Sequence, residues 1–423
     1  MNKKIKIGLF VLIILGTITL CLTYKSDDKI IKTKKRKQNN LAIMIKEDGA
    51  TDYTKSNSKD IPKGDYVLNR DKSYCKNNGK IGNYDSSLGK VSFSFIGTDS
   101  CYLYFDYKKE TIKLGSTELV VNSETPDFNQ IATTNEGLFK AQDDLGMSYY
   151  FRGAVDNNWV KYGKYTKDMY NCNNGAISAT DTGNSCTKIA SSGDDIYWRI
   201  IRINGDNSIR MIYTGTSAPD SNTKVVMTES ANDFGYIRAT SAGMSKFNQN
   251  YDNAEYVGYM YTIKEQHGTS KSSDIKTYLD NWYANYTDLN KTGTKITDQI
   301  YCNDRTASTS NVAYSTTNYT TLTSWNSTGT NYYYGANGRV WNNPVSPDYK
   351  CPVASDKFTT TTVKGNGKLS YPVGLISADE ITFAGLPAGK TNNSFYLYTG
   401  AYYWAGSPYE FYGDNSREFY VYD

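Results

Sequence analysis

The sequence predicts an α+β protein in which a small all-β module precedes a larger domain of strands with a few helices. Three observations predict it: short alternating apolar runs between residues 61 and 122, a hairpin around residue 204, and two capped helices near residues 275 and 380. Alternation with period two indicates half-buried strands, and apolar spacings of three and four indicate amphipathic helices. An apolar N-terminal stretch adds a transmembrane helix to this prediction.

Residues 1–24 are expected to form a cytoplasmic tip and an uncleaved membrane anchor. Lys3, Lys4 and Lys6 precede an uncharged run from Ile7 to Tyr24, which is about long enough to span a bilayer. No small-residue cleavage site follows the run, which favours an anchor over a removed signal peptide. The basic segment after it would place that side in the cytoplasm by the positive-inside rule.

The cysteines favour the opposite orientation. An even number of them follows the anchor in polar surroundings, which indicates disulfides formed in an oxidising compartment. Among the connectivities that six cysteines allow, we expect nearest-neighbour pairing: Cys75–Cys101, Cys172–Cys186 and Cys302–Cys351. The prediction is therefore a single-pass cell-membrane protein with the bulk of the chain extracellular.

Two segments follow the anchor. Residues 25–60 are basic and polar and are predicted to be a linker, and residues 61–122 are predicted to be the small β module. Its expected strands are 66–68, 91–96, 102–105 and 118–121. Because a core of this size is marginal, the bridge Cys75–Cys101 is expected to stabilise it.

The larger domain, residues 128–423, contains the hairpin. Residues 197–203 and 208–213 are rich in β-branched residues and flank an Asn-Gly turn, which is a strong hairpin signal. The arginines that interrupt both runs, Arg199, Arg202 and Arg210, are expected on its solvent-exposed face.

Two helices are predicted from their caps. Ser273 precedes an apolar stripe made by Ile275, Tyr278, Leu279 and Trp282. The run 377–380, Ser-Ala-Asp-Glu, is a capping box that opens a short helix ended by the glycine at position 385.

Composition excludes several function classes. Lys and Arg number 47 against 43 Asp and Glu, a net charge of +4, which argues against a nucleic-acid binder that works by bulk charge. The single histidine, His267, argues against a histidine-liganded metal centre or a Ser-His-Asp hydrolase. His267 lies in a polar loop and is interpreted as a surface residue, so no catalytic residue and no metal ligand are predicted.

Several motifs of the larger domain are familiar: SYYFRGAVDNNWVKYGKY at 148–165, YWRIIRINGDNSIRMIYTGT at 197–216, LSYPVGLISADEITFAG at 369–385 and YLYTGAYYWAGSPYEF at 396–411. They resemble an uncharacterised exported surface-protein domain family of low-GC Gram-positive bacteria. The resemblance implies a C-type-lectin-like, formylglycine-generating-enzyme-like fold for 128–423 and membrane anchoring. Two departures are an apparent insertion at 171–196 and the lack of the strand with which the family closes the domain.

Aromatic residues supply the candidate ligand-binding residues. Tyrosines number 39, and alternation cannot bury all of Tyr402, Tyr403 and Trp404 on one strand face. Tyr, Ser, Gly and Asn together are typical of adaptable recognition surfaces. The alternative for each residue is an inward position in a Tyr-rich core. The candidates are Trp325, Tyr332, Tyr333, Tyr334, Tyr402, Trp404 and Tyr409.

No cofactor is predicted. A lectin-like fold raises the alternative of bound Ca²⁺, for which oxygen ligands are plentiful. However, the run 341–343, Trp-Asn-Asn, lacks the acid of the Trp-Asn-Asp signature, and no EF-hand spacing occurs.

The predicted function is non-catalytic binding or adhesion, with a glycan or protein surface as the ligand and the membrane as a partner through the anchor. One alternative is a structural subunit of a surface appendage, assembled from copies of itself in a pilin-like manner. The other is an enzyme on a formylglycine-enzyme-like scaffold, which the lack of a cysteine after Cys351 disfavours.

Overall fold

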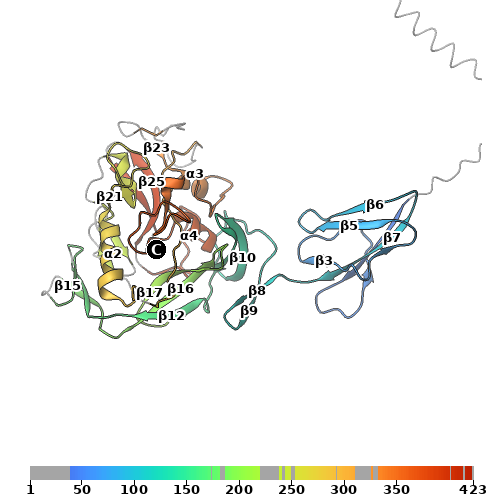
Figure 1. The fold of residues 1–423 in the computed structure, drawn as a ribbon, viewed down its shortest axis with the longest axis horizontal. Coiled ribbons are helices and arrows are strands. Elements are labelled where there is room, and N and C mark those ends of the chain that lie inside the picture. The colour runs from blue at the N-terminus through green and yellow to red at the C-terminus, as the bar shows by residue number, and fades with distance from the viewer. Residues whose placement is uncertain are drawn as a thin grey trace, which may run out of the picture. The chain divides into compact units, whose positions relative to one another are not determined.

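The computed structural model describes residues 39–172, 174–181, 186–219, 238–240, 243–248, 253–291, 293–309, 325–326, 332–400, 402–412 and 415–421. The chain divides into two compact units, the first ending at Tyr107 and the second beginning at Lys108. Figure 1 shows the elements of each unit.

The first unit is a β-sheet covered on one face by a hairpin. The sheet has the order β2-β1-β7-β3, with β4 also paired to β7, and the hairpin is β5–β6. Leu103 and Phe105 of β7 are buried together with Ile43 of β1. The strands are β1 (Asn40–Lys46), β2 (Thr54–Lys55), β3 (Tyr66–Leu68), β4 (Tyr74–Cys75), β5 (Lys80–Asp85), β6 (Lys90–Ser94) and β7 (Ser100–Tyr107).

The boundaries of this unit differ from the expected ones at both ends. β1 lies inside the segment predicted as a linker and pairs in parallel with β7 over its whole length, because its apolar residues 41–45 complete the core. The hairpin of β8 (Thr111–Leu114) and β9 (Thr117–Val120) belongs to the second unit. Glu110, which precedes β8, pairs there with Lys140 at 2.5 Å and accepts a hydrogen bond from the Tyr149 hydroxyl at 2.8 Å.

The second unit is built on a five-stranded sheet of order β10-β11-β16-β12, with β17 on the other edge of β16. These strands are β10 (Asn135–Asp143), β11 (Gly146–Gly153), β12 (Trp159–Lys164), β16 (Asp195–Ile203) and β17 (Ile209–Gly215). The pair β16–β17 confirms the predicted hairpin.

A second five-stranded sheet has the order β19-β18-β25-β23, with β26 paired to β25. Its strands are β18 (Arg238–Thr240), β19 (Gly243–Ser245), β23 (Tyr332–Tyr333), β25 (Tyr403–Tyr412) and β26 (Asn415–Val421). Small sheets complete the unit. They consist of β13 (Met169–Cys172), β14 (Ile177–Ser178), β15 (Cys186–Ala190), β20 (Met260–Tyr261), β21 (Lys271–Ser272), β22 (Tyr301–Cys302) and β24 (Lys357–Phe358).

Both predicted helices are confirmed. In α2 (Asp274–Tyr286) the Ser273 hydroxyl accepts the Lys276 amide at 3.2 Å, and the predicted apolar stripe is buried. In α4 (Ala378–Ala384) Ser377 and Glu380 form the capping box, and Gly385 ends the helix at φ 122°. The remaining helical elements are α3 (Gly335–Trp341), η1 (Ala254–Val257) and η2 (Ala354–Asp356).

The predicted exposure of the hairpin arginines is wrong. Arg199, Arg202 and Arg210 are all buried. Arg199 donates to the Asn158 side chain at 2.7 Å and to the Val155 carbonyl at 2.9 Å. Both faces of this hairpin are therefore covered, and the charges stay inside because each one has partners there.

Arg202 and Arg210 meet at the buried carboxylate of Glu380. The Arg202 Nε lies 3.3 Å from Glu380 Oε1, and the Arg210 Nη2 donates to Oε2 at 3.2 Å. Arg202 also pairs with Asp143 at 3.0 Å. Burial acts to raise the pKa of Glu380, but Arg210 and Arg202 outweigh it and lower that pKa. The capping-box glutamate thus joins α4 to β16 and β17.

The predicted fold class is wrong. The structure is mostly β-sheet, 38% strand against 11% helix, and the three α-helices that it describes have 13, 7 and 7 residues. Helical spacing is sustained only along α2, while the Tyr- and β-branched-rich segments elsewhere form strands. The prediction of an α+β, C-type-lectin-like domain that follows a membrane helix is therefore wrong.

The predicted anchor, residues 1–24, lies outside the described residues. Among the helices that are described, none is long and apolar enough to cross a membrane. The prediction of a single-pass protein of the cell membrane is accordingly not upheld.

The three expected disulfides are present. They are Cys75–Cys101, Cys172–Cys186 and Cys302–Cys351. The first joins β4 to β7 in the first unit, and the second joins β13 to β15, so each closes a directly paired position of a sheet.

Replacing Glu380 with glutamine should strongly destabilise the second unit. The substitution removes the carboxylate that pairs with the buried guanidinium of Arg210 and leaves Arg202 with Asp143 alone, which costs about 3–5 kcal/mol in the free energy of unfolding at pH 7. Urea denaturation measures this, and Glu124→Gln, at an exposed position, is the control.

The pH dependence gives a second test of the same carboxylate. Because the folded pKa of Glu380 lies below its ordinary value of 4.5, its contribution is complete above that value and is lost as the pH falls through the folded pKa. The stability difference between wild type and Glu380→Gln should therefore shrink below about pH 4.5. A difference that stays constant from pH 7 to 3 would contradict this assignment.

Candidate functional site

A pocket of about 740 Å³ lies in the second unit. We call it the aromatic pocket. Strands β12, β16 and β17 form one wall, α2 contributes the floor, and the β8–β9 hairpin and two loops near residues 297 and 374 complete the rim. Its principal apolar lining residues are Leu114, Leu119, Trp159, Val160, Tyr162, Trp198, Ile209, Met211, Tyr213, Trp282, Tyr283, Ile296, Tyr301, Val373, Leu375 and Trp404.

The sheet wall follows from the pairing of three strands. Trp198 of β16 lies opposite Val160 of β12 on one side and Tyr213 of β17 on the other. Such directly paired positions place their side chains on one face of a sheet. The rim of the pocket includes two lining residues that stay partly in water: Ile209, 38% exposed, and Trp159, 39% exposed, which alternates with Val160 on β12 and packs against Tyr197 at 5.8 Å.

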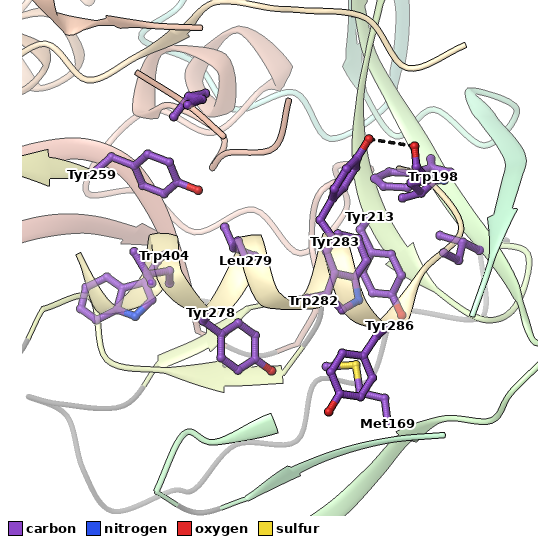
Figure 2. Packing of buried hydrophobic residues seen from close by; sticks show 14 of the residues in the cluster. Met169, Trp198, Tyr213, Tyr259, Tyr278, Leu279, Trp282, Tyr283, Tyr286 and Trp404 are labelled. Carbon is purple, nitrogen blue, oxygen red and sulfur yellow. Dashed lines mark hydrogen bonds between the residues drawn. The ribbon is translucent and has the colours of Figure 1, made fainter. Parts of the chain in front are cut away.

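The floor comes from the predicted apolar stripe of α2. Figure 2 shows Trp282 and Tyr283 on the helix beside Trp198 and Tyr213 of the sheet. The Trp282 ring centroid lies 5.3 Å from that of Tyr213 and 6.3 Å from that of Trp198, both edge to face. These contacts are part of a core cluster, so the pocket has a preformed floor.

Polar atoms of the aromatic side chains are bonded within the protein. The bonds run from Trp198 Nε1 to the Tyr162 carbonyl (2.8 Å), from Trp282 Nε1 to the Tyr165 hydroxyl (3.1 Å), from the Tyr283 hydroxyl to the Leu289 carbonyl (2.9 Å) and from the Tyr301 hydroxyl to the Pro372 carbonyl (2.8 Å). The rings therefore present mainly carbon surface to the pocket.

Three phenols of the pocket, those of Tyr213, Tyr283 and Tyr301, are neutral at physiological pH. Burial raises the pKa of Tyr213 and of Tyr283 above the ordinary value. Burial also raises the pKa of Tyr301, although the nearby guanidinium of Arg210 acts against it. A neutral phenol is not a general base, so these rings contribute shape and surface.

Arg210 and Lys295 are the charged residues in the lining. The guanidinium of Arg210 is held by Glu380 and lies 4.4 Å from the Tyr301 ring centroid. Lys295 is exposed at the mouth, where its amide donates to the Tyr162 hydroxyl at 2.6 Å. The inner charge is thus neutralised within the protein, and the outer one faces water.

Most of the predicted ligand-binding residues lie elsewhere. Tyr332, Tyr333 and Tyr334 are buried, and Trp325 packs with Tyr332 and Tyr334 in a separate cluster beside η1. The Tyr334 hydroxyl donates to the Ala254 carbonyl at 2.7 Å and so joins this cluster to η1.

The candidates near β25 divide between two places. Tyr409 packs against Tyr333 at 5.9 Å, and Tyr402 is partly buried. Trp404 is buried against Phe247 and is the predicted residue that lines the aromatic pocket. The structure thus gathers Trp325 and the tyrosines of 332–334 into core packing and does not join them to Trp404.

Several pocket residues are not predicted as site residues from the sequence: Trp159, Trp198, Met211, Tyr213 and Tyr301. For Trp282 the sequence predicts only a place in a buried stripe. The available signal was local: Trp159 and Trp198 each lie in a segment that alternates like a strand. Nothing in that alternation indicates that the two segments pair with each other.

His267 has a partner that its loop did not reveal. Its Nδ1 lies 2.8 Å from Asp356 Oδ2, and Asp356 is paired with the buried guanidinium of Arg305 at 2.6 Å. Across the described residues, no group of three or more His, Cys, Asp or Glu side chains is arranged to hold a metal ion.

No protein-family model, curated protein or solved structure matches this chain. The resemblance to an exported surface-protein family therefore stays a prediction from the sequence motifs.

Substitutions at the floor and the rim should separate packing from recognition. Trp282→Ala removes a buried ring and should lower the free energy of unfolding by about 3–5 kcal/mol. Trp159→Ala, at a partly exposed position, should cost about 1 kcal/mol or less. Urea denaturation followed by circular dichroism measures both. Equal losses would show that the rim is part of the core.

Proposed function

We propose that this protein is a non-catalytic binding protein whose aromatic pocket receives an apolar segment of a partner protein. The observation that carries the proposal is the pocket itself, about 740 Å³ of space walled by aromatic and aliphatic side chains. Ligand pockets are typically about 300–1,000 Å³ and mostly apolar, with few polar groups.

Several indole and phenol groups of the pocket already have hydrogen-bond partners inside the protein, which favours an apolar ligand over a sugar. A sugar hydroxyl that leaves water without a new partner costs about 1–3 kcal/mol. The indole N–H groups of Trp198 and Trp282 and the hydroxyl of Tyr283 already donate within the protein. The sequence analysis leaves two ligand classes, a glycan and a protein surface. The lining of the pocket favours a protein surface as its ligand.

The rim supports the same conclusion. Trp159 and Ile209 keep large apolar side chains partly in water, although burying them would release about 25 cal/mol for each Å² of apolar surface. Protein interfaces concentrate their binding energy where aromatic residues form well-packed pockets that exclude water. Covering this rim with a partner segment would provide that burial.

In the alternative of a structural subunit, the apolar segment that enters the pocket comes from a second copy of this chain and not from another protein. If the segment came from a second copy of this chain, the protein would assemble with increasing concentration. The enzymatic alternative gains no support from the pocket, where Arg210 is held by Glu380 and the phenols of Tyr213, Tyr283 and Tyr301 are neutral.

Peptide selection tests the proposal. A random-peptide library is selected on the wild-type chain, and the best synthetic peptides are titrated by calorimetry. We expect enrichment of Trp, Phe, Leu and Met and a negative heat-capacity change on binding, because apolar surface is buried. Ile209→Asp should weaken binding at least about tenfold, since a carboxylate at the rim must be desolvated.

The matched control is Ile263→Asp, which changes a similarly exposed isoleucine, 44% exposed, outside the pocket. Its affinity should stay within about twofold of wild type. Failure to select any peptide, or equal losses in the two variants, would remove the support for this function. Light scattering over a concentration series detects self-assembly.

A further inference from the structure

The first unit carries a second aromatic surface, independent of the aromatic pocket. Leu103 and Phe105 of β7 point into the core, so the alternate residues Tyr102 and Tyr104 lie on the opposite face of the sheet. The β5–β6 hairpin contributes its side chains to the core face. The face that holds the two tyrosines is therefore the one that this hairpin leaves open.

Two further tyrosines extend this face. Tyr74 of β4 is paired directly with Tyr102, and their rings are stacked at 5.0 Å with 13° between the planes. Tyr53 packs edge to face on Tyr104 at 5.0 Å. We call these four residues the tyrosine row. Tyr74 is 47% exposed and the other three are partly exposed.

Three tyrosine hydroxyls of the row are available for hydrogen bonds with a ligand. In the part of the chain that the structure describes, the hydroxyls of Tyr74, Tyr102 and Tyr104 have no hydrogen-bond partner. Tyr53 differs, because its hydroxyl donates to Asp106 and accepts from Asn69 at 3.1 Å. These bonds, and one from the Asn69 amide at 2.7 Å, hold the Asp106 carboxylate on this face; it stays charged, with Lys46 and Lys72 as the basic groups acting on it.

Two lysines lie over the row. The Lys72 Nζ is 4.6 Å from the Tyr53 ring centroid, and the Lys76 Nζ is 5.4 Å from that of Tyr102. Neither ammonium forms an ion pair with a described residue. Cation–π contacts at exposed positions are weak, so both groups can turn toward a ligand that carries negative charge.

We propose that the tyrosine row is a recognition surface for an acidic glycan, a sugar chain that carries carboxylate groups. The rings match the flat C–H faces of sugars, and the free hydroxyls can exchange hydrogen bonds with sugar hydroxyls. The ammonium groups of Lys72 and Lys76 can form charge-assisted hydrogen bonds with the carboxylates. Tyrosine suits this use because its ring is rigid and amphipathic.

Charge balance favours a glycan over a single-stranded nucleic acid, which would also stack on aromatic rings. Such binders combine stacking with a positively charged groove along the backbone. Residues 39–107, the part of this unit that the structure describes, hold equal numbers of basic and acidic side chains, so the sheet that carries the row has no excess charge for a dense polyanion. A chain with fewer, spaced carboxylates fits the two lysines.

Calorimetric titration of the full chain tests the inference. The probes are oligogalacturonate, its neutral methyl ester and a hyaluronan oligosaccharide. We expect saturable binding of the two acids and about tenfold weaker binding of the ester. Tyr74→Ala and Tyr102→Ala should each weaken binding about tenfold, as loss of a stacking ring does elsewhere. Ile96→Ala, at an 87% exposed position outside the row, is the control.

Further variants separate stacking from charge. Tyr74→Phe and Tyr102→Phe keep the rings and should stay within about threefold of wild type. The double variant Lys72→Gln, Lys76→Gln should bind acid and ester alike, whereas Lys90→Gln on β6 should still discriminate between them. Urea denaturation confirms that each variant is folded, and Ile209→Asp should bind the glycan as wild type does because the pocket is a separate site.

The inference is overturned if neither acid binds the wild-type chain, or if the alanine and control variants lose affinity equally. It is also overturned if the phenylalanine variants lose as much as the alanine variants, or if an oligothymidylate binds more tightly than both acids.

Discussion

The buried carboxylate of Glu380 holds one helix and two strands of the second unit in a single arrangement, because it must stay paired with both Arg202 and Arg210. An unpaired charge in a protein interior is costly, so neither strand can slide relative to α4 without losing its partner. The same glutamate closes the capping box at Ser377. One side chain therefore sets where the helix begins and where it docks.

This constraint reaches the aromatic pocket through Arg210. Its guanidinium is fixed by Glu380 on one side and lies against the ring of Tyr301 on the other. Tyr301 is in turn held by the Pro372 carbonyl at 2.8 Å. Part of the pocket wall is thus an extension of a buried ion network, and its position is set before any ligand arrives. Preorganised walls of this kind reduce the entropy lost on binding.

Tyrosine serves two opposite purposes in this chain. In the second unit, rings such as Tyr213 and Tyr283 are buried, and their hydroxyls find partners inside, the Tyr165 hydroxyl and the Leu289 carbonyl. In the first unit, the rings of the tyrosine row lie on an open sheet face, and Tyr74 is nearly half exposed. The residue suits both because one end of its side chain is apolar and the other is polar. The two proposed recognition surfaces differ accordingly, one being mainly carbon and the other rich in free hydroxyls.

Local signals in the sequence determined the β16–β17 hairpin, helices α2 and α4 with their caps, and strands β3, β6 and β7 of the first unit. Each depends on neighbouring residues, such as Ser377 with Glu380, or on a spacing that one segment carries alone. Tertiary structure decided the rest. Two arginines of the hairpin are buried with Glu380, which lies far along the chain, and Tyr332 and Tyr334 are core residues because η1 packs against them. Trp159, Trp198 and Trp282 line one pocket because strand pairing and helix docking bring their segments together. The periodicity of a segment shows which of its residues share a face, but it does not show which other segment that face will contact.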